Sequence, residues 1–161
     1  MTAKEYNLCV DEHADGVYRF ILKNIKVEDK ARDIVQDSFE KMWMKVEEIS
    51  FAKAKSYLFT TAYHTMIDHI RKDQRQSPMD DVSFNLHHTS NSYTDLKEIL
   101  NQAVAMLPEV QRHVVLLRDY EGYSYQEIGE ITGLNESQVK VYIYRARNFL
   151  KNYLVSVDAV L

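Results

Sequence analysis

Residues 122–150 constrain the fold of this chain more than any other stretch, because helix-start and turn signals follow one another there at short spacing. Ser124 and Glu127 have the spacing of a capping box and predict a helix that begins at Ser124. Gly133 can adopt the positive φ that commonly follows the end of a helix. Asn135 is a favourable N-cap, and Gln138 lies where a reciprocal cap is expected. The stretch therefore predicts two helices joined by a sharp turn.

The second of these helices has one apolar side and one polar, basic side. Val139, Ile143, Ala146 and Leu150 repeat at helical intervals and form a single stripe. The opposite face carries Ser137, Val141, Tyr144, Arg145 and Asn148, flanked by Lys140, Arg147 and Lys151. This pattern is typical of a helix-turn-helix that binds DNA, and an ordinary helical hairpin with a solvated charged face would also produce it.

Charge is distributed unevenly along the chain. The net charge is -4, which argues against a protein that coats nucleic acid non-specifically. Residues 135–153 nevertheless hold four basic side chains and one acidic one, whereas residues 98–134 hold two basic and six acidic ones. We therefore expect weak binding to free duplex DNA and a need for a partner protein that helps the chain to dock.

Helical spacing dominates the remainder of the chain, which contains only 2 prolines and 4 glycines. We predict an all-α fold. Residues 74–94 break the pattern, because they are rich in Ser, Asn, Asp and Thr and contain Pro78. The expected organisation is two small helical domains, over 1–75 and 95–161, joined by a flexible linker over 76–94. His87 and His88 in the linker are expected to be solvated.

The composition argues against disulfide bonds, metal sites and membrane insertion. A single cysteine, Cys9, excludes a disulfide framework and a cysteine-based zinc cluster. We predict no metal and no cofactor. The first ten residues lack the apolar run of a signal peptide, and no segment approaches the roughly 18 apolar residues of a membrane span. We expect a cytoplasmic protein with no direct membrane insertion.

Two helices expected in the first domain carry polar faces. The helix predicted over 27–46 places Asp33, Gln36, Asp37 and Glu40 outside its apolar positions. The helix predicted over 52–72 places Tyr63, His64, Asp68, Arg71 and Lys72 largely outside its stripe. The pattern alone favours solvated helix faces for both sets. Rings and cations together also suit single-stranded nucleic acid, because rings stack on bases and cations meet phosphates.

Two sequence blocks together resemble one family. DIVQDSFEKMW at 33–43, followed by AKSYLFTTAYHTMIDHIRK at 54–72, resembles conserved region two of the sigma-70 family. LPEVQRHVVLLRDYEGYSYQEIGEITGLNESQVKVYIYRARNFL at 107–150 resembles region four. Both blocks in this order, with a short linker, are the arrangement of the extracytoplasmic-function (ECF) group, which lacks the middle region. The resemblance implies a sigma factor, a dissociable RNA polymerase subunit that recognises promoters and catalyses no reaction itself.

For region two, the resemblance implies a polymerase contact and a DNA contact. The helix matching 33–43 would dock on the clamp helices of the polymerase β′ subunit through Asp33, Gln36, Asp37 and Glu40. Phe39 and Trp43 would lie in the core of region two. The helix at 54–72 would face the -10 element, where an extruded base is captured, and the candidate residues are Tyr63, His64, Asp68, Arg71 and Lys72. His64 stands where the family commonly has asparagine.

For region four, the resemblance implies contact with the -35 element. Ser124 and Tyr125 would meet phosphate at a helix N-terminus. The second helix would present its outer residues to the DNA, namely Ser137, Lys140, Val141, Tyr144, Arg145 and Arg147. The implied partners are core RNA polymerase, through its β′ clamp helices and β flap, promoter DNA and, as for many family members, an anti-sigma factor.

Two other functions are weighed against a sigma factor. A helix-turn-helix regulator that is not a polymerase subunit would bind operators and would use residues 33–43 and 54–72 only as scaffold. An enzyme could use His64, Asp68 and His69, since His64 and Asp68 share a helix face, but no further ligand set or phosphate loop accompanies them. Promoter-specific transcription with core polymerase distinguishes a sigma factor from an operator-binding regulator.

Overall fold

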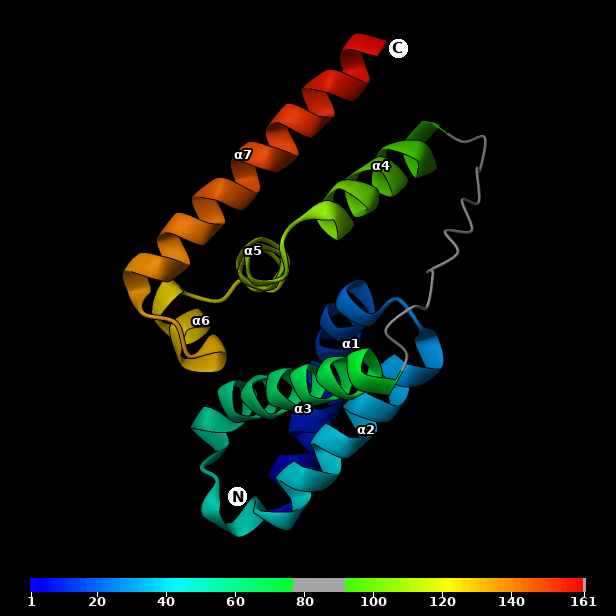
Figure 1. Cartoon of the computed structure of the whole chain (residues 1–161). Helices are drawn as coiled ribbons and strands as arrows, with labels where there is room; N and C mark the ends of the chain where they lie inside the picture. Colours follow the sequence, from blue (N-terminus) through cyan, green and yellow to red (C-terminus); the bar gives the residue numbers. More distant parts are fainter. Residues whose placement is uncertain (77–91, 161) are drawn as a thin grey trace.

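The computed structural model describes residues 1–76 and 92–160, and its regular elements are all helices (Figure 1). The predicted all-α fold is confirmed. The first domain contains α1 (Ala3–Ile25), α2 (Glu28–Met44) and α3 (Ala54–Gln76), with the 3-10 turns η1 (Val46–Glu48) and η2 (Phe51–Lys53) between α2 and α3. The second contains α4 (Ser92–Met106), α5 (Glu109–Val115), the π-helical turn η3 (Leu116–Tyr120), α6 (Tyr125–Thr132) and α7 (Glu136–Val160).

The segment predicted as a linker, residues 76–94, separates the two helical domains and lies mostly outside the described residues. Residues 77–91, including His87 and His88, belong to the part that is not described. At its edges, α3 ends at Gln76 and α4 begins at Ser92. The exact domain limits therefore stay a prediction.

The first domain is a three-helix bundle around an apolar core. A capping box begins α1, in which the Thr2 hydroxyl accepts a hydrogen bond from the Glu5 N–H (3.1 Å). The largest fully buried side chains of the bundle are Phe20, Ile21, Ile34, Met42, Leu58 and Met66. The buried Ser38 hydroxyl donates to the Ile34 carbonyl (2.6 Å), so this polar group in α2 has a partner.

The prediction that Trp43 lies in the core of the first domain is wrong. Its side chain is 48% exposed. The residues that α2 buries are Ala31, Ile34, Ser38 and Met42. Trp43 follows Met42 and is rotated by about 100° from the buried face, so it packs against Tyr6 at the surface, with ring centroids 4.9 Å apart. Phe39, which was also predicted in the core, is partly buried and packs against it.

The second domain is built around the packing of α7 on α5. The stripe predicted for α7 is confirmed: Val139, Ile143 and Ala146 are buried and Leu150 is partly buried. Gly129 allows α6 to approach the turn that follows it, because a Cβ at this position would lie 2.8 Å from the Leu134 carbonyl oxygen. These contacts fix the angle between α6 and α7.

The two domains share one continuous interior. Phe20 on α1 and Phe59 on α3 belong to the same buried cluster as Val114 on α5 and Tyr123. The Phe59 and Tyr123 rings meet edge to face, with centroids 4.9 Å apart. Figure 1 shows α5 and α6 above α1 and α3, with α2 and α7 on opposite sides of the molecule. The outer faces of α2 and α7 therefore point away from the contact between the domains.

Candidate nucleic-acid and polymerase interfaces

The helix-turn-helix forms as the sequence predicts. The Ser124 hydroxyl accepts from the Glu127 N–H (3.1 Å), and the Glu127 carboxylate accepts from the Ser124 N–H (3.0 Å). Gly133 ends α6 with φ at 80°. The Asn135 side chain then accepts from the Gln138 N–H (2.8 Å), and the Gln138 side chain accepts from the Asn135 N–H (3.0 Å). Both caps and the glycine turn are confirmed, so local sequence signals predict where α6 begins and ends and where α7 begins.

The outer face of α7 is exposed over the whole predicted set. These residues are Ser137, Lys140, Val141, Tyr144, Arg145 and Arg147. Tyr144 is 68% exposed and Val141 is 45% exposed, although both are large apolar side chains. Cations and exposed apolar groups on one helix face match what a major groove offers, namely guanine acceptors and thymine methyl groups. This face can therefore read base edges.

Tyr125, in the first turn of α6, lies beside two cations. The Arg118 guanidinium carbon is 4.4 Å from the centre of the Tyr125 ring, and the Lys140 ammonium is 5.7 Å from it. Cation–π attraction holds such groups over the ring face. Since the α6 N-terminus adds the positive end of its helix dipole, this corner of the domain favours an anion such as a phosphate.

Arg147 forms an ion pair within the second domain. Its guanidinium makes two hydrogen bonds to the carboxylate of Asp119 in η3, at 3.0 and 2.5 Å. These bonds raise the pKa of Arg147. Arg147 thus ties α7 to η3, and its predicted contact with DNA would have to be made alongside Asp119.

The polar side of α2 is open to solvent as the sequence indicates. Asp33, Gln36 and Glu40 are exposed. Asp37 is half-buried, and its carboxylate lies 3.5 Å from Nε2 of His69 on α3. A mainly apolar groove of about 390 Å³ lies beside this face and has the lining residues Tyr6, Asn7, Val10, Tyr18, Arg32, Val35, Gln36 and Phe39. A charged rim beside an apolar groove is a common composition for a protein-docking surface.

The residues predicted for the -10 element divide into two groups. His64, Asp68, Arg71 and Lys72 are exposed on α3. Tyr63 is only 9% exposed, and its hydroxyl lies 3.0 Å from Nδ1 of His113 on α5. In this conformation Tyr63 is not at the surface with the other four, so it can reach DNA only if α5 moves away from α3.

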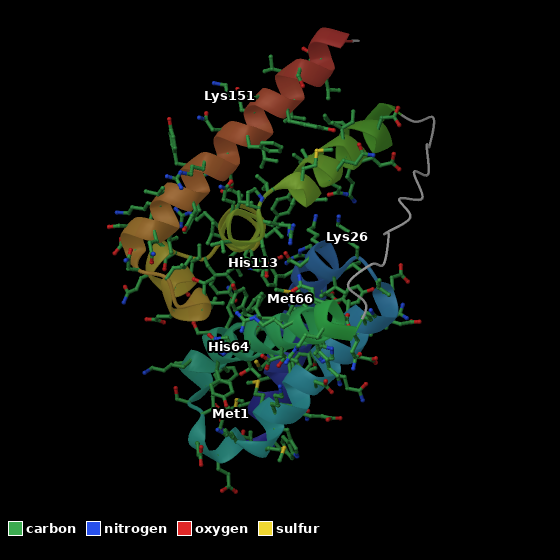
Figure 2. All side chains as sticks on the ribbon, in the orientation of Figure 1. Met1, Lys26, His64, Met66, His113 and Lys151 are labelled. Atoms are coloured by element: carbon green, nitrogen blue, oxygen red, sulfur yellow. The ribbon has the colours of Figure 1, made fainter. Side chains whose placement is uncertain are left out.

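The Tyr63–His113 pair is buried between the domains. Figure 2 shows His113 on the side of α5 that faces the first domain. Burial raises the pKa of Tyr63 to about 12. Burial, and secondarily the charge of Arg112, lowers the pKa of His113 to about 3. Both groups are therefore neutral at pH 7. Sequence reasoning missed His113, although a histidine within the apolar run at 113–117 was the available signal.

Two further features were sought among the residues that the structure describes. Within 1–76 and 92–160, no cluster of three or more His, Cys, Asp or Glu side chains is arranged to bind a metal. No helix in these ranges has both the length and the apolar character needed to cross a bilayer.

Comparison with known proteins identifies both domains. Residues 9–76 match Sigma-70 region 2, and residues 97–150 match Sigma-70, region 4. The chain is 32% identical over 153 residues to RNA polymerase sigma factor SigV of Bacillus subtilis, covering 93% of this chain and 91% of SigV. It is 26% identical over 144 residues to ECF RNA polymerase sigma factor SigM of the same organism, covering 86% of this chain and 88% of SigM.

A solved structure agrees with these matches over nearly the whole chain. The sigma factor RpoE from Bartonella quintana, in complex with the anti-sigma factor NepR, is 27% identical and superposes with a TM-score of 0.80, covering 94% of this chain and 98% of RpoE. The two matched regions follow one another along the chain, and the superposition covers both. The chain therefore belongs to the ECF group of the sigma-70 family, non-catalytic factors that direct RNA polymerase to promoters.

Proposed function

We propose that this sigma factor binds its partners through three separate helix faces. The outer face of α2 docks on core RNA polymerase, that of α3 meets the -10 element, and that of α7 reads the -35 element. The observation that carries the proposal is the two-sidedness of α7, which buries Val139, Ile143 and Ala146 and exposes a polar, basic face. Residues 1–75 and 95–161 act as the two domains of a promoter clamp.

Family membership decides among the functions considered from the sequence. An operator-binding regulator would use the first domain only as scaffold, whereas residues 9–76 match Sigma-70 region 2. An enzyme built on His64, Asp68 and His69 is likewise set aside, because the family is non-catalytic.

At the -35 element, contacts follow from side-chain chemistry. Arg145 pairs with guanine acceptors, and Val141 and Tyr144 contact thymine methyl groups or sugar. Ser124 and Tyr125, at the N-terminus of α6, hold a phosphate that fixes the register of α7 on the duplex. Lys140 adds positive charge at the same corner, since it lies over the Tyr125 ring.

At the -10 element, α3 offers His64, Asp68, Arg71 and Lys72 to the non-template strand. Their exposure on one helix supports this assignment. His64 stands where asparagine is common in the family, so we expect a base preference that differs from that of asparagine-bearing relatives. Tyr63 joins these residues when the two domains separate, and its ring can then stack on a base.

Two surfaces support the polymerase contacts. Asp33, Gln36, Asp37 and Glu40 supply acidic and polar groups that orient α2 on the β′ clamp helices. A second contact, with the β flap, is supported by large apolar side chains that are exposed on the second domain. These are Leu96 and Met106 on α4, Val110 on α5, and Phe149 and Val155 on α7.

We also propose an anti-sigma factor as a regulatory partner. The support is that the Bartonella quintana RpoE, similar over nearly its whole length, was solved in complex with one. We place the protein in the cytoplasm, where core RNA polymerase and promoter DNA are found.

The test is transcription by reconstituted holoenzyme. Start sites mapped after overexpression give the promoter sequences, and a template library randomised in the -35 element then reports base preference. Arg145→Ala should flatten the preference at one or two adjacent positions, equal to about 1–3 kcal/mol for a bidentate contact with guanine. Lys151→Ala, which removes one exposed cation further along α7, is the matched control. An unchanged preference in Arg145→Ala would refute the assignment of α7.

A further inference from the structure

The cations on the outer face of α7 differ in what holds them in place. The Lys140 ammonium lies 3.4 Å from the Glu136 carboxylate. The Arg147 guanidinium makes two hydrogen bonds to the Asp119 carboxylate. Among the residues that the structure describes, no carboxylate lies within ion-pair distance of Arg145. Arg145 therefore has no ion pair to break when it meets a base.

Arg145 lies against an aromatic ring instead. Its guanidinium carbon is 6.0 Å from the centre of the Tyr142 ring. The two residues are three apart on α7, and residues at this spacing are neighbours on a helix surface. Long side chains in a helix lean toward its N-terminus, which carries the guanidinium toward Tyr142. Cation–π attraction favours the conformers in which Arg145 lies over the ring.

Tyr142 is an anchored support for this contact. Its ring is partly buried and packs against the hydrophobic core, next to the buried Ile143. At about 100° per residue, Tyr142 lies at the border between the buried stripe of α7 and its outer face. Packing on one side therefore restricts the ring, while the other side stays open to Arg145.

Stacking on a ring and reading a base use different parts of a guanidinium. Cation–π attraction acts through its flat face, whereas hydrogen bonds to O6 and N7 of guanine come from N–H groups in its plane. Tyr142 can thus hold Arg145 without using the donors that read the base. A carboxylate occupies two such donors, as Asp119 does with Arg147. A side chain that is already restrained also loses less conformational freedom on binding.

We propose that Tyr142 is a positioning residue for base readout at the -35 element, because its ring sets the conformation from which Arg145 pairs with guanine. The proposal rests on the proposed function, namely the contact of Arg145 with a -35 base. Since the ring acts only through Arg145, its removal should affect the one or two positions that Arg145 reads and leave the others unchanged. The expected loss of guanine preference is about two- to fivefold, the range for an exposed cation–π contact.

The test uses reconstituted holoenzyme and the template library randomised in the -35 element. Tyr142→Leu keeps an apolar side chain that favours a helix but removes the ring, so it should lower the guanine preference at the position that Arg145→Ala flattens. Tyr142→Met is a second variant without a ring, and urea denaturation shows that each variant is folded. Tyr142→Phe keeps the ring and should retain the wild-type preference.

The double variant separates positioning from direct contact. Tyr142→Leu combined with Arg145→Ala should flatten the preference no further than Arg145→Ala alone, because the ring has no other route to the base. A further loss in the double variant would give Tyr142 a contact of its own and overturn the proposal.

Three other results would also overturn it. Wild-type preference in both Tyr142→Leu and Tyr142→Met would mean that Arg145 needs no support from the ring. An equal loss at every position of the -35 element would indicate that α7 as a whole is displaced, which is a purely structural role. A loss in Tyr142→Phe as large as that in Tyr142→Leu would assign the effect to the hydroxyl group.

Failure of the proposed function is recognised separately, because Arg145→Ala alone tests it. An unchanged preference in Arg145→Ala refutes the assignment of α7, whatever the variants of Tyr142 do. If Arg145→Ala flattens the preference while Tyr142→Leu and Tyr142→Met keep it, α7 reads the -35 element and only the role of Tyr142 is refuted.

Discussion

Arg147 on α7 and Asp119 in the π-helical turn η3 form a two-point ion pair, with Nε of Arg147 3.0 Å from Oδ2 of Asp119 and a second guanidinium nitrogen 2.5 Å from Oδ1. The pair joins the proposed reading helix to the turn that precedes α6. The same turn ends at Tyr120, beside Glu121, whose carboxylate accepts two hydrogen bonds from Arg19 on α1. η3 therefore borders both the -35-reading domain and its contact with the first domain.

A double-mutant cycle on this pair tests its contribution to stability. Because the two side chains are 47% and 37% exposed, solvent screens the attraction. We expect a coupling free energy of about 0.5–1 kcal/mol between Arg147→Ala and Asp119→Ala. Urea denaturation of the two single variants and the double variant measures it. A coupling near zero would mean that the pair does not hold α7 in solution.

The same Arg147→Ala variant tests the DNA contact predicted from the sequence. If Arg147 neutralises a phosphate, the salt dependence of promoter binding by holoenzyme should weaken, with the slope against log salt changing by about 1. Lys4→Ala, which removes one exposed cation from α1 outside the proposed DNA-binding faces, serves as the matched control. If stability falls while the slope is unchanged, Arg147 acts only as a tie between α7 and η3.

The turn between α6 and α7 gives a second prediction. Gly133 has φ of 80°, and no atom lies within 4 Å of an added Cβ, so alanine there would suffer backbone strain without a clash. Gly133→Ala should destabilise the chain by about 1–2 kcal/mol, the cost of a left-handed conformation for a residue with a side chain. Gly133→Asn should cost less, because asparagine tolerates this region better. Chemical denaturation measures both.

Glu130→Ala, at an exposed position of α6, is the control for the glycine variants, and we expect a change within about 0.5 kcal/mol. Equal stability of Gly133→Ala and Glu130→Ala would contradict the positive φ at Gly133.

The buried His113 predicts a dependence of stability on pH. Its pKa falls from 6.5 to about 3 on folding, so between these values the unfolded chain binds more protons than the folded one. Its contribution to stability is therefore complete above pH 6.5 and is lost progressively as the pH falls toward 3. The largest slope for one such group is about 1.4 kcal/mol per pH unit. Urea denaturation at a series of pH values measures it.

The matched variant replaces the titrating imidazole of His113 and also removes the Tyr63 hydroxyl, so that no buried polar group is left without its partner. His113→Leu with Tyr63→Phe removes both polar groups of the pair and should flatten the pH dependence between 6.5 and 3 relative to the wild type. If both proteins lose stability with the same slope, carboxylates elsewhere and not His113 cause the acid sensitivity.

The sequence was most informative where structure is local. The capping pair Ser124 and Glu127, the turn at Gly133 and the stripe along α7 each depend on residues a few positions apart, so periodicity and capping chemistry predicted them. The resemblance of two sequence blocks to sigma-70 regions two and four also predicted the order of the two domains along the chain. The exposed face of α7 then followed from the position of its buried stripe.

Contacts between distant segments were not predictable in this way. Periodicity placed Tyr63 outside the main stripe of α3, but α5 covers a second face of that helix and buries the ring against His113. The prediction for Trp43 was wrong for a different reason. The resemblance implied a core position, but the buried face of α2 includes Met42 and leaves Trp43 rotated toward the surface. Since only tertiary packing decides which of several helix faces is covered, such assignments need the fold.

The docking face of α2 gives the last prediction. The Asp37 carboxylate is half-exposed and lies 3.5 Å from His69, so its removal should change stability by no more than about 0.5 kcal/mol. If α2 docks on the β′ clamp helices, Asp37→Ala should weaken core polymerase binding several-fold, equal to about 1 kcal/mol, because the contact loses an orienting charge. Fluorescence anisotropy with labelled sigma factor and purified core enzyme measures the affinity.

Asp29→Ala is the matched control, because it removes the same charge from the first turn of α2, where the side chain is 92% exposed. A general effect of net charge would weaken polymerase binding equally in Asp37→Ala and Asp29→Ala. In that case neither variant would show a steeper dependence of binding on salt. A specific contact would weaken it only in Asp37→Ala. If Asp37→Ala binds polymerase with wild-type affinity, the contact does not involve this part of α2. The apolar groove that Gln36 and Phe39 line would then be the next candidate.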